Sequence, residues 1–233
     1  MDDCTVLVYT HSEYADIFDI TIRRLQKHFG YAKLLICTNN AQLVRDMLSD
    51  QYEIHEYDDT LVYHMKLASA LEVIKTKYVL LHHDNNCLYD DVRNDVMRFM
   101  LGLMNEKEID VLRLSACGII NPVRSHPDIV IRNDGPHYFT VFPSIWRVTS
   151  FLQLCRDLRK GYRAAEDNEC QVYTGNLRGY YISPMAQDPH EDISYLYPSA
   201  HVIQYGRWFY PMHKWVIDNI AREYDTDLFI RGT

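Results

Sequence analysis

The sequence predicts an α/β fold in which a mostly parallel central sheet is flanked by helices. Between residues 4 and 86, short apolar runs alternate four times with segments whose apolar residues recur at helical spacing. The apolar runs are continuous, as in strands buried on both faces, and their alternation with helices favours a parallel sheet. A length of 233 residues suits one domain.

The expected elements follow in chain order. Strands are expected over residues 4–10, 32–40, 52–59 and 77–86, with helices over 15–30, 41–50 and 60–76. Next come a helix over 90–109, a strand over 110–116 and a loop-rich or β-ribbon stretch over 117–137. A strand over 137–142, a turn at Pro143 and a helix ending near Gly161 come next, and short strands and loops make up the remainder.

The composition is that of an ordinary globular protein. Hydrophobic residues make up 47% and charged residues 24%, and no apolar run is long enough for a membrane span. The formal net charge of −8 argues against nucleic-acid binding, which needs a basic face. Six scattered cysteines without a CxxC pair, and an acidic start without a signal-peptide pattern, predict free thiols and a cytoplasmic location.

Three common motifs are absent from the sequence. No GxGxxG follows the first expected strand, no GxxxxGK[ST] occurs, and GxSxG is missing. A Rossmann dehydrogenase, a P-loop NTPase and an α/β hydrolase therefore lose their main sequence support.

Polar residues follow all four of the first expected strands, where open α/β sheets bind their ligands. After the fourth strand come Asp84, Asn85 and Asn86, whose oxygens suit a Mg²⁺ or Mn²⁺ that bridges nucleotide phosphates. An Asx turn explains the same three residues about equally well. Because adjacent strand residues point to opposite faces, at most one of His82 and His83 faces such a site.

Two more stretches hold candidate residues. Asp58 or Asp59 is expected to cap the following helix, in which Tyr63 and Lys66 share a face near the start, where an anionic ligand is favoured. A solvated lysine is the more common outcome.

The stretch 163–171 carries Glu166 and Asp167, and a carboxylate there could deprotonate an acceptor hydroxyl in sugar transfer. An exposed acidic turn is the alternative.

Six segments occur in an order that resembles one family over nearly the whole chain. They are VLVYTHSEYADIFDITIRRL, LLICTNN, EYDDTLVYHMKLASALEVIKTKYVLLHHDNNCLY, VFPSIWRVTSFLQLC, AAEDNE and HVIQYGRWFYP. Together they resemble GT-A-fold glycosyltransferases of the small bacterial and large-DNA-virus type, which use nucleotide-sugar donors. The resemblance implies a GT-A-like single domain, with a nucleotide-sugar-binding half over 1–115 and a smaller acceptor-binding lobe over 116–233.

The resemblance also implies roles for individual residues. The implied donor-binding residues are Thr10, His11, Ser12, Thr38, Asn39, Asn40, Asp58, Tyr63, Lys66, His83, Asp84 and Asn85. Glu166 is the implied general base with Asp167 as runner-up, and Ser144 and Trp146 belong to the acceptor site, a core anchor being the alternative for Trp146. Asp84 and Asn86 would hold Mn²⁺ or Mg²⁺, weakly, because the family commonly has a second acidic residue where Asn86 stands.

The implied reaction moves a hexose or deoxyhexose from a UDP-sugar, or a GDP- or dTDP-sugar, to a hydroxyl of a glycan or glycoprotein-linked oligosaccharide, with inversion. Two alternatives stay open. One is a sugar-1-phosphate nucleotidyltransferase, which usually needs a Gly-rich basic loop where this chain has YTHSEYAD. The other is a non-catalytic module that binds a nucleotide sugar.

Overall fold

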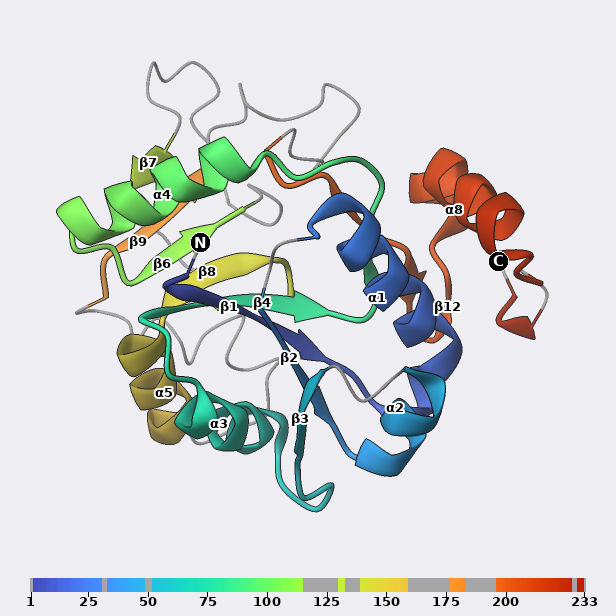
Figure 1. Ribbon diagram of the computed structural model, residues 1–233, viewed down its shortest axis with the longest axis horizontal. Coiled ribbons are helices and arrows are strands. Elements are labelled where there is room, and N and C mark those ends of the chain that lie inside the picture. The colour runs from blue at the N-terminus through green and yellow to red at the C-terminus, as the bar shows by residue number, and fades with distance from the viewer. Residues whose placement is uncertain are drawn as a thin grey trace.

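The computed structural model describes residues 2–30, 33–48, 52–114, 130–132, 139–158, 177–182, 196–227 and 230–232. An eight-stranded sheet crosses the molecule in the order β3-β2-β1-β4-β8-β6-β9-β7 (Figure 1). Its strands are β1 (Cys4–Tyr9), β2 (Lys33–Thr38), β3 (Glu53–Glu56), β4 (Tyr78–His83), β6 (Val111–Arg113), β7 (Val130–Arg132), β8 (Ser144–Arg147) and β9 (Gly179–Ile182). The strands β3, β2, β1 and β4 are mutually parallel, as are β6 and β9, whereas β8 and β7 are antiparallel to their neighbours. The predicted α/β fold with a mostly parallel sheet is confirmed.

Helices cover both faces of this sheet (Figure 1). They are α1 (Ala15–His28), α2 (Ala41–Met47), α3 (Tyr63–Val73), α4 (Asn94–Glu106) and α5 (Val148–Asp157), with a short 3₁₀ helix η1 (Ser12–Tyr14) before α1. In β1, Val6 and Val8 pack in the cluster of α1, α2 and α4, whereas Leu7 packs in the cluster of α3 and α5. Burial on both faces explains why the strand sequences are continuously apolar. No helix in the described part of the chain has both the length and the hydropathy to cross a membrane.

A third apolar cluster joins the C-terminal region to α1. Val216, Ile217 and Ile220 of the helix α8 (Tyr210–Tyr224) share this cluster with Ile17 and Ile20 of α1. Two small sheets lead into α8, one of β5 (Asn86–Leu88) with β10 (Ser199–His201) and one of β11 (Ile203–Gln204) with β12 (Arg207–Trp208). The cluster therefore holds the end of the chain beside the start of α1, as Figure 1 shows for α8 and α1.

Two elements differ from the sequence prediction. The sequence predicts only short strands and loops near the C-terminus, but α8 is a helix of 15 residues that starts at a proline-containing turn with Pro211. A kink at His213 interrupts its backbone, but the buried residues His213, Val216, Ile217 and Ile220 keep helical spacing, a pattern that the sequence prediction missed. The strand predicted before Pro143 follows it instead, because proline has no N–H for a ladder and β8 pairs with both β4 and β6 from Ser144 onward.

Candidate functional site

Two adjacent strands bring Thr10 and Asp84 together at the carboxyl edge of the sheet. Tyr9 of β1 is opposite His83 of the parallel strand β4, so the residues that follow them meet at the same edge. The Thr10 hydroxyl donates a hydrogen bond of 2.7 Å to Asp84 Oδ2, and the Asp84 N–H donates to the Tyr9 carbonyl at 3.1 Å. The Thr21 hydroxyl of α1 donates to the Asp84 carbonyl. Asp84, only 7% exposed, is therefore fixed by both its side chain and its backbone.

The Asp84 carboxyl is poised between its two protonation states. Burial raises the pKa of Asp84 to about 7, although the Thr10 hydrogen bond, the backbone of His11 and the positive charge of Arg231 lower it. Burial acts in this direction because a low dielectric disfavours the charged form. A cation bound beside the carboxylate would favour ionisation, so cation binding and loss of the Asp84 proton are expected to be coupled.

Polar side chains from three loops form a network next to this pair. Asn39 Oδ1 accepts a hydrogen bond of 2.8 Å from the Ser12 N–H, and Asn39 Nδ2 lies 3.1 Å from both Ser12 Oγ and His11 Nε2. His11 Nε2 is also 3.3 Å from Asp59 Oδ2, and Lys66 Nζ donates to Asp59 Oδ1 at 2.5 Å. The loops after β1, β2 and β3 are thereby joined to the start of α3. This network presents amide, hydroxyl, imidazole and carboxylate groups at one edge of the sheet.

Aromatic rings underlie the network on the α3 side. Tyr9 and Tyr57 are stacked, with ring centroids 5.4 Å apart and an angle of 2° between their planes, and the Tyr57 hydroxyl donates to the Thr10 carbonyl at 2.9 Å. The Tyr63 hydroxyl and His83 Nε2 share a hydrogen bond of 2.6 Å. Burial lowers the pKa of His83 to about 3, so its imidazole is neutral at physiological pH. These contacts fix the positions of the aromatic side chains that pack beneath the polar network.

His82 and His83 point to opposite faces of β4, as expected for adjacent strand residues. His82 Nδ1 shares a hydrogen bond of 2.8 Å with the Tyr197 hydroxyl, and Tyr197 belongs to the apolar cluster of α1 and α4. Only His83 therefore faces the aromatic rings beside Asp84.

Three of the implied donor-binding residues serve local structure. Thr38 Oγ1 accepts a hydrogen bond of 3.2 Å from the Asn40 N–H. Asn40 is the N-cap of α2, and its Oδ1 accepts from the Leu43 N–H at 3.0 Å. Asp58 Oδ1 accepts from both the N–H and the hydroxyl of Thr60 at 2.9 and 2.7 Å, which is an Asx turn. Neighbouring groups therefore engage one polar atom of each of these three side chains.

The predicted capping of α3 by Asp58 or Asp59 is wrong. The N-cap residue of α3 is Val62, which makes no side-chain capping hydrogen bond. Asp59 instead reaches Lys66 in the first turn of the helix, so the acidic residue acts through a side-chain ion pair rather than through the backbone.

Ser144 and Trp146 lie in the core rather than on a surface. Both side chains are at most 1% exposed. The Trp146 ring stacks on Phe151 with centroids 4.5 Å apart, and its Nε1 donates to Ser144 Oγ at 2.9 Å. This geometry corresponds to the core-anchor alternative, because a sugar-facing platform needs an exposed ring face. Glu166 and Asp167 lie outside the described residues.

Replacing Trp146 with Phe is expected to lower the free energy of unfolding by about 1–3 kcal/mol, because it leaves a small cavity and removes the hydrogen bond to Ser144. Nucleotide affinity should stay unchanged, since the ring does not reach Asp84 or the polar network. Urea unfolding and calorimetric titration measure the two effects. A large loss of affinity without loss of stability would restore a role for Trp146 in ligand binding.

Asp84 and the two amides that follow it are the side chains that could hold a cation at this edge of the sheet. Asn86 is 1% exposed, and its Nδ2 donates to Asn85 Oδ1 at 2.9 Å, so both amides lie directly after the carboxylate. Within the described ranges no three His, Cys, Asp or Glu side chains gather around a possible metal position. Mg²⁺ is commonly held by one or two carboxylates together with substrate phosphates. With one carboxylate here, a Mg²⁺ or Mn²⁺ would need most of its remaining ligands from a bound diphosphate or from water.

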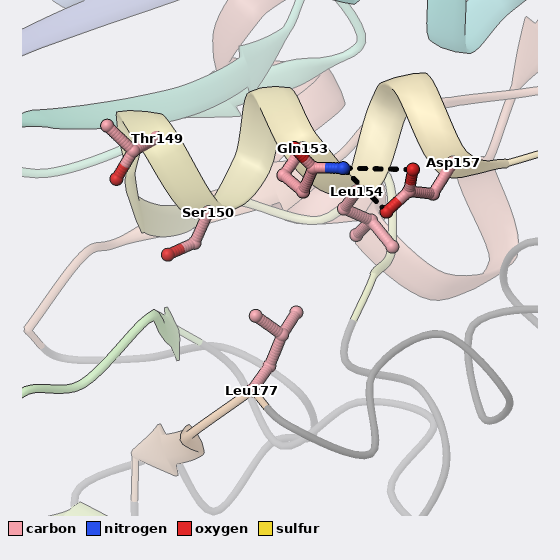
Figure 2. A pocket seen from close by; sticks show the side chains of 6 residues that line it. All are labelled: Thr149, Ser150, Gln153, Leu154, Asp157 and Leu177. Carbon is pink, nitrogen blue, oxygen red and sulfur yellow. Dashed lines mark hydrogen bonds between the residues drawn. The ribbon is translucent and has the colours of Figure 1, made fainter.

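A cavity of about 280 Å³ lies at the opposite end of the sheet, beside α5 (Figure 2). It is lined by Thr149, Ser150, Gln153, Leu154, Asp157 and Leu177. Gln153 Nε2 donates to both carboxylate oxygens of Asp157 at 2.9 Å, as the dashed lines in Figure 2 show. Leu177 comes just before β9, at the amino end of the parallel strands. This cavity is therefore separate from the polar network around Asp84.

Three residues of the site are not among the implied donor-binding residues. Asp59 is expected only as a possible helix cap and Tyr57 is not singled out, although both flank Asp58 in the same acidic stretch. Arg231, whose charge acts on Asp84, has no sequence signal, because it reaches the site from the far end of the chain.

Comparison with known proteins places the fold. No model of a known protein family and no curated protein matches the sequence. A nucleotidyl transferase from Methanothermobacter has a similar structure, with a TM-score of 0.56 and 12% identity over 96% of this chain and 100% of that one. A cytidylyltransferase from Leptospira borgpetersenii gives a TM-score of 0.53 and 10% identity over 78% of this chain and 76% of that one.

The bifunctional IspDF from Campylobacter jejuni gives a TM-score of 0.51 and 9% identity over 84% of this chain, which spans 52% of that protein. Likeness at such low identity concerns the fold alone. It shows that this α/β chain shares the GT-A-like fold of these proteins.

Proposed function

We propose that this chain is a nucleotide-dependent transferase that binds a nucleoside-diphosphate sugar at the carboxyl ends of β1, β2 and β4. The observation that carries the proposal is the buried pair of Thr10 and Asp84, joined by a 2.7 Å hydrogen bond where the two strands end. Ligands of open α/β sheets bind at this edge. The names of the structural neighbours, nucleotidyl transferase and cytidylyltransferase, support a nucleotide as the ligand.

Different residues of the site would bind different parts of the nucleotide. The amide and hydroxyl groups of Asn39 and Ser12 suit the polar atoms of a base or ribose, and the Asp59–Lys66 pair borders them. Asp84, with Asn85 and Asn86, would hold a divalent cation next to the phosphates. That cation would offset negative charge on the leaving phosphate. Thr10 would keep the Asp84 carboxylate oriented, and the neutral His83 would accept or donate one hydrogen bond without adding charge.

Two reactions involve such a ligand. The neighbours favour nucleotidyl transfer, in which a sugar phosphate oxygen attacks the α-phosphorus of a nucleoside triphosphate and pyrophosphate leaves.

Glycosyl transfer is the second candidate, because the first loop, Thr10 to Tyr14, holds no glycine, lysine or arginine to bind a triphosphate. In that reaction Glu166, with Asp167 as the alternative, would take the proton of the acceptor hydroxyl.

A single set of incubations tests the proposal and separates the two reactions. The protein is incubated with Mg²⁺ or Mn²⁺ and either a nucleoside triphosphate plus a sugar 1-phosphate, or a UDP-, GDP-, CDP- or dTDP-sugar. Release of pyrophosphate in the first arm supports nucleotidyl transfer. Release of nucleoside diphosphate in the second supports glycosyl transfer, which can proceed slowly onto water. Nucleotide binding without either product leaves a non-catalytic module, and no binding at all contradicts the proposal.

A further inference from the structure

The C-terminal segment returns to the first loop through one arginine. Arg231 Nε donates to Asp16 Oδ2 at 2.7 Å, and Arg231 Nη2 donates to Asp16 Oδ1 at 2.5 Å and to the Glu13 carbonyl at 3.0 Å. Its guanidinium carbon lies 4.8 Å from the centre of the Tyr14 ring. The segment is anchored there by a 3.1 Å hydrogen bond from the Trp208 N–H to the carbonyl of the residue after Arg231.

The arginine is more enclosed than its partner and acts on the candidate site. The Arg231 side chain is 13% exposed and that of Asp16 is 44% exposed. Hydrogen bonding to Asp16 raises the pKa of Arg231, and the charge of Asp84 raises it further. A positive charge in a partly enclosed position is screened less by water than one on the surface. Arg231 and Asp84 therefore influence each other across the first loop.

We propose that Arg231 is a phosphate-binding residue, which supplies from the end of the chain the positive charge that the first loop lacks. The proposal rests on the nucleotide-binding function proposed above. Arg231 Nη1 has only a long contact of 3.4 Å, to the Gly206 carbonyl, among the described residues. Each Nη atom carries two N–H donors, so at least one is available to a phosphate oxygen.

Lys66 does not replace Arg231 in this role. Its Nζ is bound to Asp59 at 2.5 Å and lies 4.8 Å from the centre of the Tyr57 ring, on the side of the network. Arg231, by contrast, contacts Glu13 and Asp16, which lie a few residues after Thr10 and His11 in the chain. Lys66 and Arg231 would therefore contact different parts of one ligand. Arg231 would contact the phosphates, which are proposed to lie near Asp84.

A purely structural role for Arg231 predicts different nucleotide affinities for the variants of Arg231 and Asp16. If Arg231 only fastened the C-terminal segment to α1, Asp16→Asn would weaken nucleotide binding as much as Arg231→Gln, because each removes the same ion pair. If Arg231 binds phosphate, Asp16→Asn keeps the guanidinium and removes a competing carboxylate. Phosphate affinity should then be unchanged or tighter in Asp16→Asn and should fall only when the arginine changes.

The experiment is a calorimetric titration of the full chain with Mg²⁺, using pyrophosphate, UDP, GDP, CDP and dTDP, and the matching nucleosides. Arg231→Gln is expected to weaken binding of the accepted nucleoside diphosphate by about 10- to 100-fold, as for loss of a hydrogen bond to a charged group. Binding of pyrophosphate should weaken as well, and binding of the nucleoside should not change. Arg231→Lys should recover part of the loss, because it keeps the charge.

The matched control is Arg156→Gln, which breaks an exposed ion pair with Glu72 of 2.7 Å on α5 and α3. Thermal unfolding of each variant shows whether it is folded. Equal losses in Arg231→Gln and Asp16→Asn, or a nucleoside affinity that falls with the diphosphate affinity, would overturn the phosphate role. If the wild-type protein binds a nucleoside diphosphate and Arg231→Gln binds it equally well, only this inference fails. If the wild-type protein binds no nucleotide, the proposed function fails with it.

Discussion

Replacing Asp84 with Asn is expected to stabilise the free protein at pH 8 and to remove the proposed cation-dependent binding of a nucleotide. Burial raises the pKa of the Asp84 carboxyl from 3.8 to about 7, so its ionised form is disfavoured in the folded state. One pKa unit corresponds to about 1.4 kcal/mol, which makes the expected gain on the order of 2 to 4 kcal/mol. An amide keeps the acceptor for Thr10 but cannot hold a divalent cation as a carboxylate does.

The sign of this effect depends on pH. A carboxyl with a raised folded-state pKa contributes stability that is fully present below pH 3.8 and is lost as pH rises through about 7. The difference between wild type and Asp84→Asn should therefore be largest above pH 7 and should vanish near pH 4. Urea unfolding from pH 4 to pH 8 measures it.

Asp95→Asn is a suitable control, because Asp95 is an exposed acid in the first turn of α4. It should leave nucleotide binding unchanged and should not stabilise the protein at pH 8. If Asp84→Asn is no more stable than wild type at pH 8, the carboxyl is not held in the disfavoured charged state. If it also binds nucleotide normally in Mg²⁺, Asp84 has no part in the site.

The sequence predicts the part of the fold that depends on local patterns. Leu7 and Val8 belong to a run apolar enough to be buried on both faces, and a parallel sheet follows from such runs. Asp84 is predicted at the site because it ends a strand, and strand ends of parallel sheets meet at one edge.

The rest of the site depends on contacts between distant segments. The ion pair of Arg231 with Asp16 joins residues 215 positions apart, and that of Arg24 with Glu223 joins residues 199 positions apart. No spacing in the sequence indicates such pairs. Tyr57 is similar, because its stacking on Tyr9 appears only when β1 and the loop after β3 lie side by side.

Acid is expected to destabilise the protein steeply below about pH 6.5, because of buried histidines, among them His82 and His83. Burial is the main cause that lowers the pKa of His82 to about 4 and that of His83 to about 3. A histidine with a depressed folded-state pKa contributes stability that is present above its unfolded value of 6.5 and is lost as pH falls. Between pH 6 and pH 4.5 the unfolded chain binds two protons at these positions that the folded chain does not.

Asp84 opposes this trend in the same pH range, because the folded protein binds one proton there that the unfolded chain does not. These three groups alone leave a net difference of about one proton, or about 1.4 kcal/mol of stability lost per pH unit, and His201, whose pKa is lowered by burial to about 4, adds about one proton more. In Asp84→Asn the opposing proton is gone, and the slope should rise by about 1.4 kcal/mol per pH unit. Asp84→Asn is thus expected to be more stable than wild type at pH 8, and its free energy of unfolding should fall more steeply with decreasing pH.

Urea unfolding midpoints between pH 4.5 and pH 7 test this balance in wild type, Asp84→Asn, His82→Gln and a His82→Gln/His83→Gln double variant. Glutamine carries no charge at any of these pH values and can still accept or donate a hydrogen bond to Tyr197 or Tyr63. The slope should therefore flatten by about 1.4 kcal/mol per pH unit for each histidine removed. An unchanged slope in His82→Gln would mean that His82 is protonated in the folded state, contrary to its full burial. A steeper slope in Asp84→Asn than in wild type would show that one buried carboxyl moderates the acid sensitivity set by its two histidine neighbours.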